Sequence, residues 1–547
     1  MAGTTFETRR AQMFPRLEAG EIDRLRRFGQ IVHADAGAAL ATAGVPAPGL
    51  FVVLAGRVAI SRRDAHDESQ PIVEHAAGQF IGEIAQLSGR PSLVDVKAIT
   101  PVEALLIAPD RLRAVLIAEA ELGERIMRAL ILRRVSLIET GAGGPIIVGR
   151  AADAEVIRLS GFLARNGHPY QHLDPDQVDC AKVLIQRFDV DESELPIVLC
   201  PNGAILRQPS NHQLGRCIGL VGPIDGERLY DVAVVGAGPA GLATAVYAAS
   251  EGLSVLVLDS RAFGGQAGAS ARIENYLGFP TGISGMALMG RAYGQAQKFG
   301  AELAIPDEVA SLVCEEDGAH RYRLALASGE SAQARTVVIA SGARYRRLDV
   351  DNLDQFEGSS VHYWASPLEA KLCAGQEVAL VGAGNSAGQA AVYLASQVKK
   401  VWMIVRGESL AATMSRYLIE RIESTPNIEV VTRSEVMALE GEDGQLMAVR
   451  WRGPGGLETT QAVSHLFLFI GAAPNTAWLT HCHVELDNHG FVRTGADLAP
   501  GHPLLQTSRK GVFAIGDARA GSVKRVAAAV GEGAQAVAAI HAYLAEA

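Results

Sequence analysis

The sequence predicts a multidomain protein in which a small β-roll and a compact α/β unit precede two doubly wound α/β units. Its 547 residues exceed the ~250–300 at which a single hydrophobic core stops growing. The first 140 residues contain short β-type runs that glycines interrupt. Farther along, a β-branched strand, a glycine-rich turn and a helix follow one another twice, from Asp231 and again from Glu377.

Composition and charge exclude several classes of protein. The net charge of −10, with 48% hydrophobic and 20% charged residues, is typical of globular protein and argues against nucleic-acid or anionic-membrane partners. No stretch approaches the ~18–20 apolar residues that span a bilayer, and the polar N-terminus lacks a secretory pattern. We therefore expect a cytoplasmic protein without a membrane or nucleic-acid partner.

Cysteine usage predicts neither structural disulfides nor a metal site. The six cysteines are scattered, without a Cys-x-x-Cys pair or the spacing of zinc ligands. The one local cluster, His481-Cys482-His483, is interpreted as a surface turn, because adjacent strand residues point to opposite faces.

The chain divides at two glycine-containing linkers. Residues 1–140 combine the β-type runs with helical patterning from Pro109 to Glu139, and a Gly/Ala-rich hinge ends this unit. Residues 145–221 alternate strands and helices and are followed by the linker VGPIDGER. We expect one compact α/β domain over that range.

The first glycine-rich turn has the form of a dinucleotide cradle. The strand Asp231–Val235 opens into Gly236-Ala-Gly-Pro-Ala-Gly241 and a helix. Gly236 permits the tight turn, Gly238 lets backbone amides approach a pyrophosphate, and Gly241 lets the helix pack close to the strand. The next strand ends in Asp259, where an acid accepts hydrogen bonds from ribose hydroxyls.

The pattern repeats with a different terminal residue. The strand Glu377–Val381 leads into Gly382-Ala-Gly-Asn-Ser-Ala387 and a helix, and the following strand ends at Arg406. Arginine hydrogen-bonds a ribose 2′-phosphate, which an acid would repel, so this cradle is expected to prefer NADP(H) to NAD(H), with assistance from Arg416. The alternative for Arg406 is a solvated arginine at an exposed strand end.

Two cradles in this order predict a flavin that accepts hydride from a nicotinamide nucleotide. From about Leu229 to Ala547 the chain resembles thioredoxin reductase and its low-molecular-weight relatives. The stretches that carry the resemblance are GAGPAG (236–241), Gly264-Gly265-Gln266, IENYLGFP (273–280), IASGA (339–343), GAGNSA (382–387), Phe513–Asp517 and Lys524–Ala527.

The resemblance implies an FAD domain made of residues 229–348 and 472–547, with an NADPH domain, residues 349–471, inserted in it. It also implies a homodimer, for which the apolar C-terminal helix GEGAQAVAAIHAYL offers a packing face. The residues expected to bind FAD are Gly236, Gly238, Pro239, Ala240, Gly241, Asp259, Gly265, Gln266, Asn275, Ser341, Gly342, Gly516, Asp517, Arg525, Val526 and Ala527. Those expected to bind NADPH are Gly382, Gly384, Asn385, Ser386, Ala387, Arg406 and Arg416.

The chain departs from this family at the redox centre. Thioredoxin reductases carry Cys-x-x-Cys just before the second cradle, whereas this chain has Trp364 and Pro367 at the two cysteine positions. Without a thiolate pair, electrons are expected to pass from the flavin directly to an unidentified acceptor, either a small protein or a small molecule. Trp364 is interpreted as an aromatic lid over the flavin or as packing between the nucleotide domains. Two alternatives stay open, a cofactor-binding sensor and a disulfide reductase that uses an external dithiol.

The middle unit resembles thioredoxin-fold domains that have lost their redox pair. In ELPIVLCPNGAIL, Pro196 stands where that fold has a cis-proline before paired strands. The redox cysteines would follow PIIVG, where this chain has Arg150–Asp153. Cys180 and Cys200 are therefore expected to be isolated thiols in a domain for docking or assembly.

The N-terminal unit resembles cyclic-nucleotide-binding domains. The resemblance rests on PGLFVVLAGRVAI and on the segment 79–91, which contains the Gly82 and Glu83 that in this family open a short phosphate-binding helix. The position of the phosphate-binding arginine is Ser92, with Arg90 as the only nearby substitute. The fold is expected, but the missing cation argues against cyclic-nucleotide binding.

Overall fold

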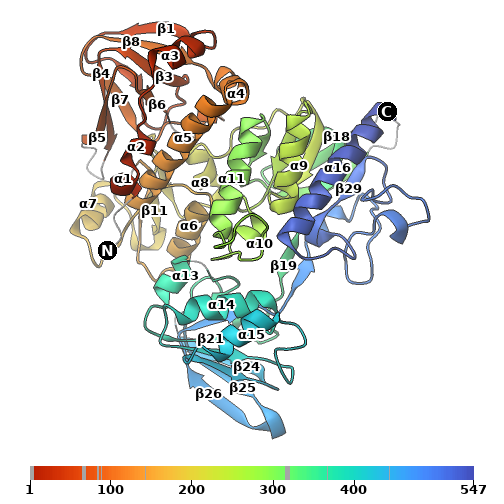
Figure 1. Ribbon diagram of the computed structural model, residues 1–547. Helices are drawn as coiled ribbons and strands as arrows, with labels where there is room; N and C mark the ends of the chain where they lie inside the picture. The colour runs from red at the N-terminus through yellow and green to blue at the C-terminus, as the bar shows by residue number, and fades with distance from the viewer. Residues whose placement is uncertain are drawn as a thin grey trace.

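The computed structural model describes residues 5–63, 69–82, 86–87, 89–141, 143–314, 321–365, 367–442 and 444–546. The elements form four groups in chain order (Figure 1). The N-terminal group lies above the middle group, the first doubly wound unit lies beside them with the C-terminal helix, and the second doubly wound unit lies below (Figure 1). None of the helices described is long and apolar enough to cross a membrane.

The N-terminal unit is a β-roll of two four-stranded antiparallel sheets, ordered β1-β8-β3-β6 and β2-β7-β4-β5. The helical patterning from Pro109 to Glu139 forms two helices. The break falls at Glu119, which has a non-helical backbone (φ −113°, ψ 82°) and whose carboxylate pairs with Arg24 at 3.0 Å. The elements are α1 (Thr5–Thr8), α2 (Arg10–Met13), α3 (Ala19–Arg26), β1 (Gln30–Ala34), β2 (Ala39–Ala41), β3 (Leu50–Ala55), β4 (Arg57–Arg63), β5 (Ser69–Ala76), β6 (Phe80–Ile81), β7 (Asp95–Ala98), β8 (Val102–Ile107), α4 (Pro109–Ala118) and α5 (Ala120–Thr140).

The middle unit has one four-stranded sheet in the order β10-β9-β11-β12. The β9 and β10 strands are parallel, whereas β11 runs antiparallel to both β9 and β12. The Leu195–Pro196 bond before β11 is cis, as expected. The elements are β9 (Ile146–Val148), α6 (Ala154–Arg165), β10 (Gln171–Leu173), α7 (Asp179–Arg187), β11 (Ile197–Leu199), β12 (Ile205–Arg207) and α8 (Asn211–Cys217).

The first doubly wound unit has a parallel core of β15, β14, β13, β18 and β29, extended by the antiparallel strands β17 and β16. Residues of β14 and β29 and the last residues of β13 and β18 are buried, which is typical of the centre of a sheet covered by helices on both faces. The elements are β13 (Leu229–Val235), α9 (Pro239–Ser250), β14 (Val255–Leu258), α10 (Gly265–Gly268), α11 (Gly285–Lys298), β15 (Glu302–Ala304), β16 (Val309–Cys314), β17 (Tyr322–Leu326), β18 (Ser331–Ile339), β29 (Val512–Ala514) and α16 (Val526–Glu546).

The second doubly wound unit has a fully parallel sheet, β20-β27-β21-β22-β23, and a three-stranded antiparallel sheet, β24-β25-β26. The chain passes from the first doubly wound unit to the second through β19 and returns through β28, and these two strands pair antiparallel. The elements are β19 (Ala343–Tyr345), α12 (Leu353–Phe356), β20 (Val361–His362), α13 (Pro367–Leu372), β21 (Glu377–Val381), α14 (Asn385–Ala395), β22 (Lys400–Ile404), α15 (Arg416–Glu423), β23 (Ile428–Val431), β24 (Glu435–Glu442), β25 (Gln445–Arg452), β26 (Glu458–Ala462), β27 (His465–Leu468) and β28 (Ala472–Pro474).

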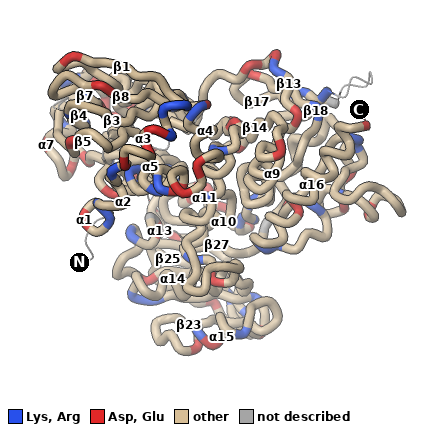
Figure 2. Tube along the Cα trace, turned by 45° about the horizontal axis from the view of Figure 1, so that its top comes forward, with Lys and Arg blue, Asp and Glu red and all other residues tan. Residues whose placement is uncertain are grey.

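The C-terminal helix α16 packs against α9 within the same chain (Figure 1). Its buried residues include Gly533 and Ile540, and a Cβ on Gly533 would lie 2.8 Å from the carbonyl oxygen of Ala240. The apolar face that the sequence offered for packing between two copies is therefore buried inside the chain, and a homodimer needs another surface. Along the described part of the chain, acidic and basic residues are interspersed (Figure 2).

Candidate functional site

The first glycine-rich turn leaves open space where a ligand is expected. Gly236 has a positive φ of 114°, which favours glycine at the end of β13. The nearest atom to a Cβ on Gly238 would be the Cα of Gly265, 3.9 Å away. The Gly236 carbonyl lies against Gly241, so a side chain at Gly241 would collide with it. As the sequence predicts, Gly236 allows the tight turn, Gly238 leaves room for a pyrophosphate to approach the backbone, and Gly241 allows close packing of the helix.

The second glycine-rich turn repeats this geometry. Gly382 has a φ of 145°, and a Cβ there would lie 2.5 Å from the carbonyl oxygen of Phe469. A Cβ on Gly384 would meet no atom within 4 Å. Ala387 is fully buried in the helix that follows. Both turns therefore combine a constrained first glycine with an open second one.

A cavity of about 510 Å³ lies between the two doubly wound units and brings most of the predicted cofactor residues together. The predicted FAD-binding residues in its lining are Gly238, Pro239, Ala240, Asp259, Gly265, Gln266, Asn275, Ser341, Gly342, Gly516, Asp517, Arg525 and Val526. The predicted NADPH-binding residues in its lining are Asn385 and Ser386. Gly236 lines a second cavity of about 540 Å³. Outside both linings lie Gly241, Ala527, Gly382, Gly384, Ala387, Arg406 and Arg416.

Asp259 lines both cavities and holds the first turn in place. Its carboxylate accepts hydrogen bonds from the backbone amides of Ala237 and Arg261, both at 2.9 Å. Burial raises the pKa of Asp259 above its ordinary value, against the opposing effect of these amides. The sequence predicts a ribose contact for this acid, and the structure adds a role in ordering the glycine turn.

Asp517 is a second acidic residue in the lining of the first cavity. Burial raises its pKa, while the nearby Lys524 acts in the opposite direction. The side-chain amide of Gln266 donates to the carbonyl oxygen of Ala343 at 2.7 Å, and the Ser341 hydroxyl donates to that of Asn475 at 2.7 Å. These bonds hold the first doubly wound unit against the two connecting segments, because Ala343 lies in β19 and Asn475 follows β28.

Trp364 lines both cavities and is held from two sides. Its indole N–H donates to the Glu369 carboxylate at 2.7 Å. The guanidinium carbon of Arg165, the last residue of α6, lies 3.6 Å from the centre of its ring. Pro367, the other residue at a redox-cysteine position, is instead the first residue of α13 and lies outside both linings.

Arg165 is a site residue that sequence analysis missed. It comes from the middle unit and lines the second cavity together with Asp259 and Trp364. Its Nη2 atom is buried and has no hydrogen-bond partner among the described residues, and burial lowers its pKa. An arginine that ends an amphipathic helix carries no local signal for this role, because its position depends on how the units pack.

The cationic residues predicted for the nucleotide differ in their surroundings. Arg406 is exposed just beyond β22, and no ion pair is recorded for it among the described residues. Arg416 instead pairs with Glu420 of its own helix at 2.9 Å. Arg421, which no sequence motif indicated, lines the first cavity and pairs with Glu274 of the other unit at 3.2 Å.

The β-roll contains a small apolar cavity of about 70 Å³, well below the ~300–1,000 Å³ of typical ligand pockets. Arg133 reaches it from α5 and donates to the carbonyl oxygen of Gly82 at 2.9 Å. Arg90, the suggested substitute for the phosphate-binding arginine, is not in the lining of this cavity, and its guanidinium carbon lies 5.6 Å from the ring centre of Tyr293 in α11. Glu83 lies outside the described residues.

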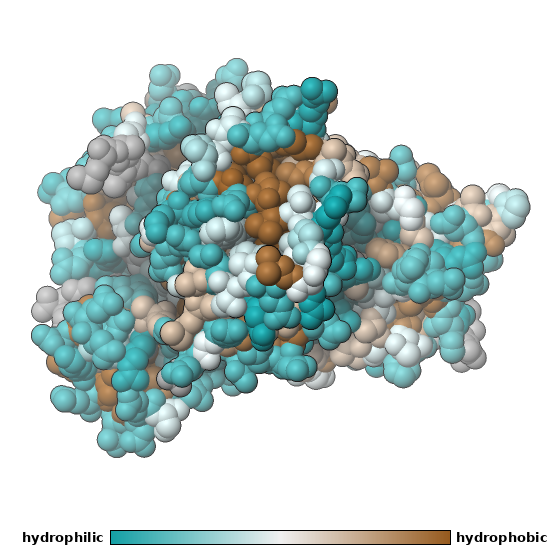
Figure 3. Space-filling model, turned by 90° about the horizontal axis from the view of Figure 1, so that it is seen from below, coloured by the Kyte–Doolittle hydropathy of each residue, from teal (hydrophilic) through white to brown (hydrophobic). Residues whose placement is uncertain are grey.

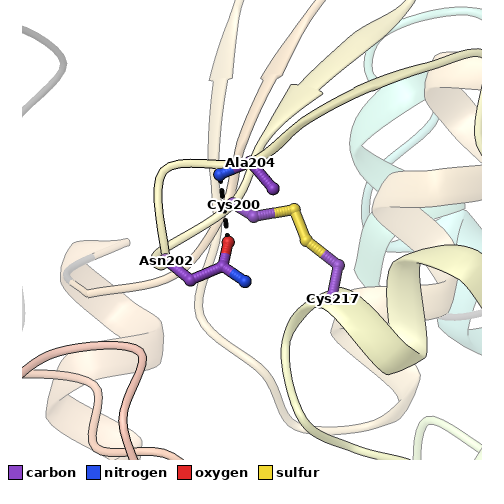
Figure 4. Close-up of a disulfide and its surroundings, with 4 residues drawn as sticks. All are labelled: Cys200, Asn202, Ala204 and Cys217. Atoms are coloured by element: carbon purple, nitrogen blue, oxygen red, sulfur yellow. Dashed lines mark hydrogen bonds between the residues drawn. A yellow bond between two sulfur atoms is a disulfide. The ribbon is translucent and has the colours of Figure 1, made fainter.

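The middle unit contains a disulfide between Cys200 and Cys217 (Figure 4). The expectation of an isolated Cys200 and of no structural disulfide is therefore wrong. The β11–β12 hairpin and α8 return the chain so that the two Cα atoms lie 6.2 Å apart, within the range that a disulfide spans. Cys180 is a free thiol, as expected. Neither bonded cysteine lines the cavities around Trp364.

Comparison with known proteins assigns two parts of the chain. Residues 230–533 match the model of the pyridine nucleotide-disulphide oxidoreductase family, and residues 31–119 match that of the cyclic nucleotide-binding domain. One of the subunits of alkyl hydroperoxide reductase from Pseudomonas putida is 33% identical over 315 residues, which are 57% of this chain and 58% of that protein. This chain thus spans less than two thirds of that relative's length.

Thioredoxin reductases align over nearly their whole length. The enzyme of Mycoplasmopsis pulmonis is 31% identical over 56% of this chain and 94% of its own length. The crystal structure of Lactococcus lactis thioredoxin reductase in the FR conformation superposes with a TM-score of 0.53 and 26% identity. It covers 58% of this chain and 100% of that one.

Proposed function

The chain belongs to the pyridine nucleotide-disulphide oxidoreductase family, and we propose that it passes electrons from NADPH through FAD to an acceptor without a redox dithiol of its own. Residues 230–533 place it among the FAD-dependent pyridine nucleotide oxidoreductases. The nucleotide preference, the absence of a dithiol step and the activity of the whole chain are parts of the proposal.

The observation that carries the proposal is the cavity shared by both doubly wound units. Open space at Gly238 and Gly384 fits the close approach of two pyrophosphates. FAD, when bound, supplies an acceptor for hydride and a donor of electrons. In the proposal Asp259, Gln266 and Asp517 hold FAD, and Asn385 and Ser386 hold the nicotinamide nucleotide.

The thiols of the described residues do not favour a dithiol route. Trp364 stands in the cavity lining, where a disulfide reductase needs a sulfur atom. Cys373, nine residues farther on, is buried, and burial raises its pKa to about 12, far from that of a nucleophilic thiolate. We infer that Trp364, under Arg165, excludes water and oxygen from the reaction site.

Stopped-flow spectroscopy tests the proposal. We expect the purified protein to be yellow, to be bleached rapidly by NADPH and to reoxidise with ferricyanide, and to remain reduced when only oxidised thioredoxin is added. Colour without bleaching by NADPH would favour the sensor hypothesis. Rapid reoxidation by thioredoxin that survives alkylation of this chain's thiols would contradict the requirement for a thiol, and reoxidation that this alkylation abolishes would contradict the absence of a redox thiol in the chain. Reoxidation that appears only after a separate dithiol is added would favour the external-dithiol hypothesis.

We propose a thioredoxin-like docking role for the middle unit. Its parallel pair followed by an antiparallel hairpin, with the cis-proline before β11, supports that interpretation. Its α6 ends against Trp364, and Arg216 of α8 pairs with Glu330 of the first doubly wound unit at 2.6 Å. Deletion of residues 1–221 should leave FAD binding intact but change the rate of electron loss to oxygen, and an unchanged rate would contradict the docking role.

A further inference from the structure

Three side chains with metal-ligand chemistry lie together in the second doubly wound unit. They are His362, Cys373 and His465, and their candidate ligand atoms all lie within 4.8 Å of one another. His362 and Cys373 are buried, whereas His465 is partly exposed. The Nε2 atom of His362 lies 3.0 Å from Nδ1 of His465. This is the only such cluster among the residues described.

The parallel sheet and α13 create this juxtaposition. His362 of β20 pairs in register with Phe467 of β27. His465 lies two residues before Phe467, so its side chain leaves the same face of the sheet as that of His362. Cys373 follows α13 directly, and its backbone N–H donates to the carbonyl oxygen of Glu369. The helical turn therefore directs Cys373 toward the face that carries both histidines.

The chemistry of the three groups fits a thiophilic divalent cation. Imidazole and thiolate are ligands that zinc accepts in tetrahedral sites. The Nε2 atom of His362 and the Nδ1 atom of His465, 3.0 Å apart, are imidazole nitrogens of the kind that binds zinc. No hydrogen bond is recorded for the Cys373 sulfur atom among the described residues, although that thiol is fully buried.

We propose that His362, Cys373 and His465 bind one zinc ion. Zinc replaces the direct contact between the imidazoles, and the ~2.0–2.1 Å bonds of a tetrahedral site set the two nitrogens roughly 3.3 Å apart, a few tenths of an ångström farther than they lie now. The Cys373 thiol loses its proton to solvent as the Zn–S bond forms. A water molecule completes the coordination from the partly exposed side of His465.

This ion positions α13 and, through it, Trp364. Glu369 and Cys373 are four residues apart and lie on one helix face, and the Glu369 carboxylate holds the indole N–H of Trp364. A bond from Cys373 to the sheet would therefore restrain the turn that orients Trp364. The proposal does not depend on the nature of the electron acceptor.

Metal analysis of the full-length flavoprotein tests the site. The protein is first stripped of metal with a chelator, then incubated with zinc and freed of unbound zinc. Inductively coupled plasma mass spectrometry should then give one zinc ion per chain. Cys373→Ser and His362→Gln should each lower this occupancy at least tenfold. Cys180→Ser, which removes a free thiol outside the cluster, is the matched control and should leave it unchanged. Wild-type protein with normal flavin content that binds no zinc would overturn the proposal, as would normal occupancy in Cys373→Ser.

Titration with Co²⁺ reports the coordination of the metal from its absorption spectrum. It requires no activity measurement, and the main result comes from the wild-type protein. Wild-type protein titrated with Co²⁺ should develop the ligand-field absorption of a tetrahedral thiolate site at wavelengths beyond the flavin bands, and should release about one proton per ion. His465→Gln should lose this absorption even if Cys373→Ser does not fold. An octahedral spectrum, or uptake without proton release, would show that the thiol does not coordinate and would refute the proposal.

Discussion

At the scale of single residues, Gly238 and Gly384 are matched positions with different expected ligands. Both have open space where a side chain would project. We expect Gly238→Val to purify without flavin, because the side chain blocks a pyrophosphate. Gly384→Val should keep its flavin but lose bleaching by NADPH at limiting concentration. Absorbance spectra with and without NADPH check both variants, and equal loss of flavin in the two would contradict the assignment of separate cradles.

Arg406 is the residue on which nucleotide preference should depend. A charge-assisted bond from arginine to a 2′-phosphate contributes about 1.5–3 kcal/mol, which corresponds to roughly tenfold or more in rate at limiting nucleotide. Arg406→Ala should therefore lower kcat/KM for NADPH by at least about tenfold and leave NADH almost unaffected. Arg452→Ala is the control and should leave both values unchanged, because Arg452 lies on β25, pairs with Glu458 and is not among the residues expected to bind the nucleotide. Equal kcat/KM for the two nucleotides in the wild-type enzyme would refute the prediction.

At the scale of elements, the end of α6 restrains Trp364. A desolvated cation–π contact is worth about 1–2 kcal/mol, so Arg165→Ala should raise the population of displaced indole by about five- to thirtyfold. We expect faster reoxidation of the NADPH-reduced enzyme by dissolved oxygen, measured by the return of flavin absorbance. Arg187→Ala changes the equivalent last residue of α7 and should have no effect. Identical reoxidation in Arg165→Ala and wild type would show that the contact is only packing.

At the scale of the whole molecule, buried histidines should make the fold sensitive to acid. Burial lowers the pKa of His75 in the β-roll and of His168 in the middle unit to about 3. In the unfolded chain each imidazole takes up a proton below about pH 6.5, whereas in the folded chain it stays neutral until about pH 3. The free energy of unfolding is therefore unaffected by these histidines above about pH 6.5 and decreases as the pH falls from there toward 3. At pH 5 the loss is about 2 kcal/mol for each histidine.

Urea unfolding at pH 7 and pH 5 measures this effect. His168→Gln should reduce the difference between the two midpoints, because glutamine does not titrate. His489→Gln replaces an exposed histidine and should leave the difference unchanged. A difference that is equal in wild type and His168→Gln would contradict the prediction.

The quaternary structure also belongs to this scale. Because the apolar face of α16 is buried against α9, a dimer needs another apolar surface. Seen from below, the molecule presents a hydrophobic stretch within a largely hydrophilic face (Figure 3). We expect light scattering to give about twice the 57.7 kDa mass of one chain. A mass of one chain across a dilution series would exclude the dimer.

The sequence alone determined the features whose signals are local. A β-branched strand, a glycine turn and a helix are adjacent in the chain, so both cradles were predictable down to the separate reasons for Gly236, Gly238 and Gly241. The β-rich character of the first 140 residues was predictable for the same reason, whereas the cis bond before Pro196 was expected only from the resemblance to thioredoxin-fold domains. The break at Glu119 was missed, because contacts with distant arginines support it.

The tertiary structure decided everything that depends on residues far apart in the chain. Arg165 reaches Trp364 only because the middle unit packs against both doubly wound units. The same holds for the Cys200–Cys217 disulfide, which has no recognisable spacing, and for the three proposed zinc ligands, which come from two strands and a helix end. Sequence periodicity reports which face of an element is buried, whereas long-range contacts are set by how those faces pack.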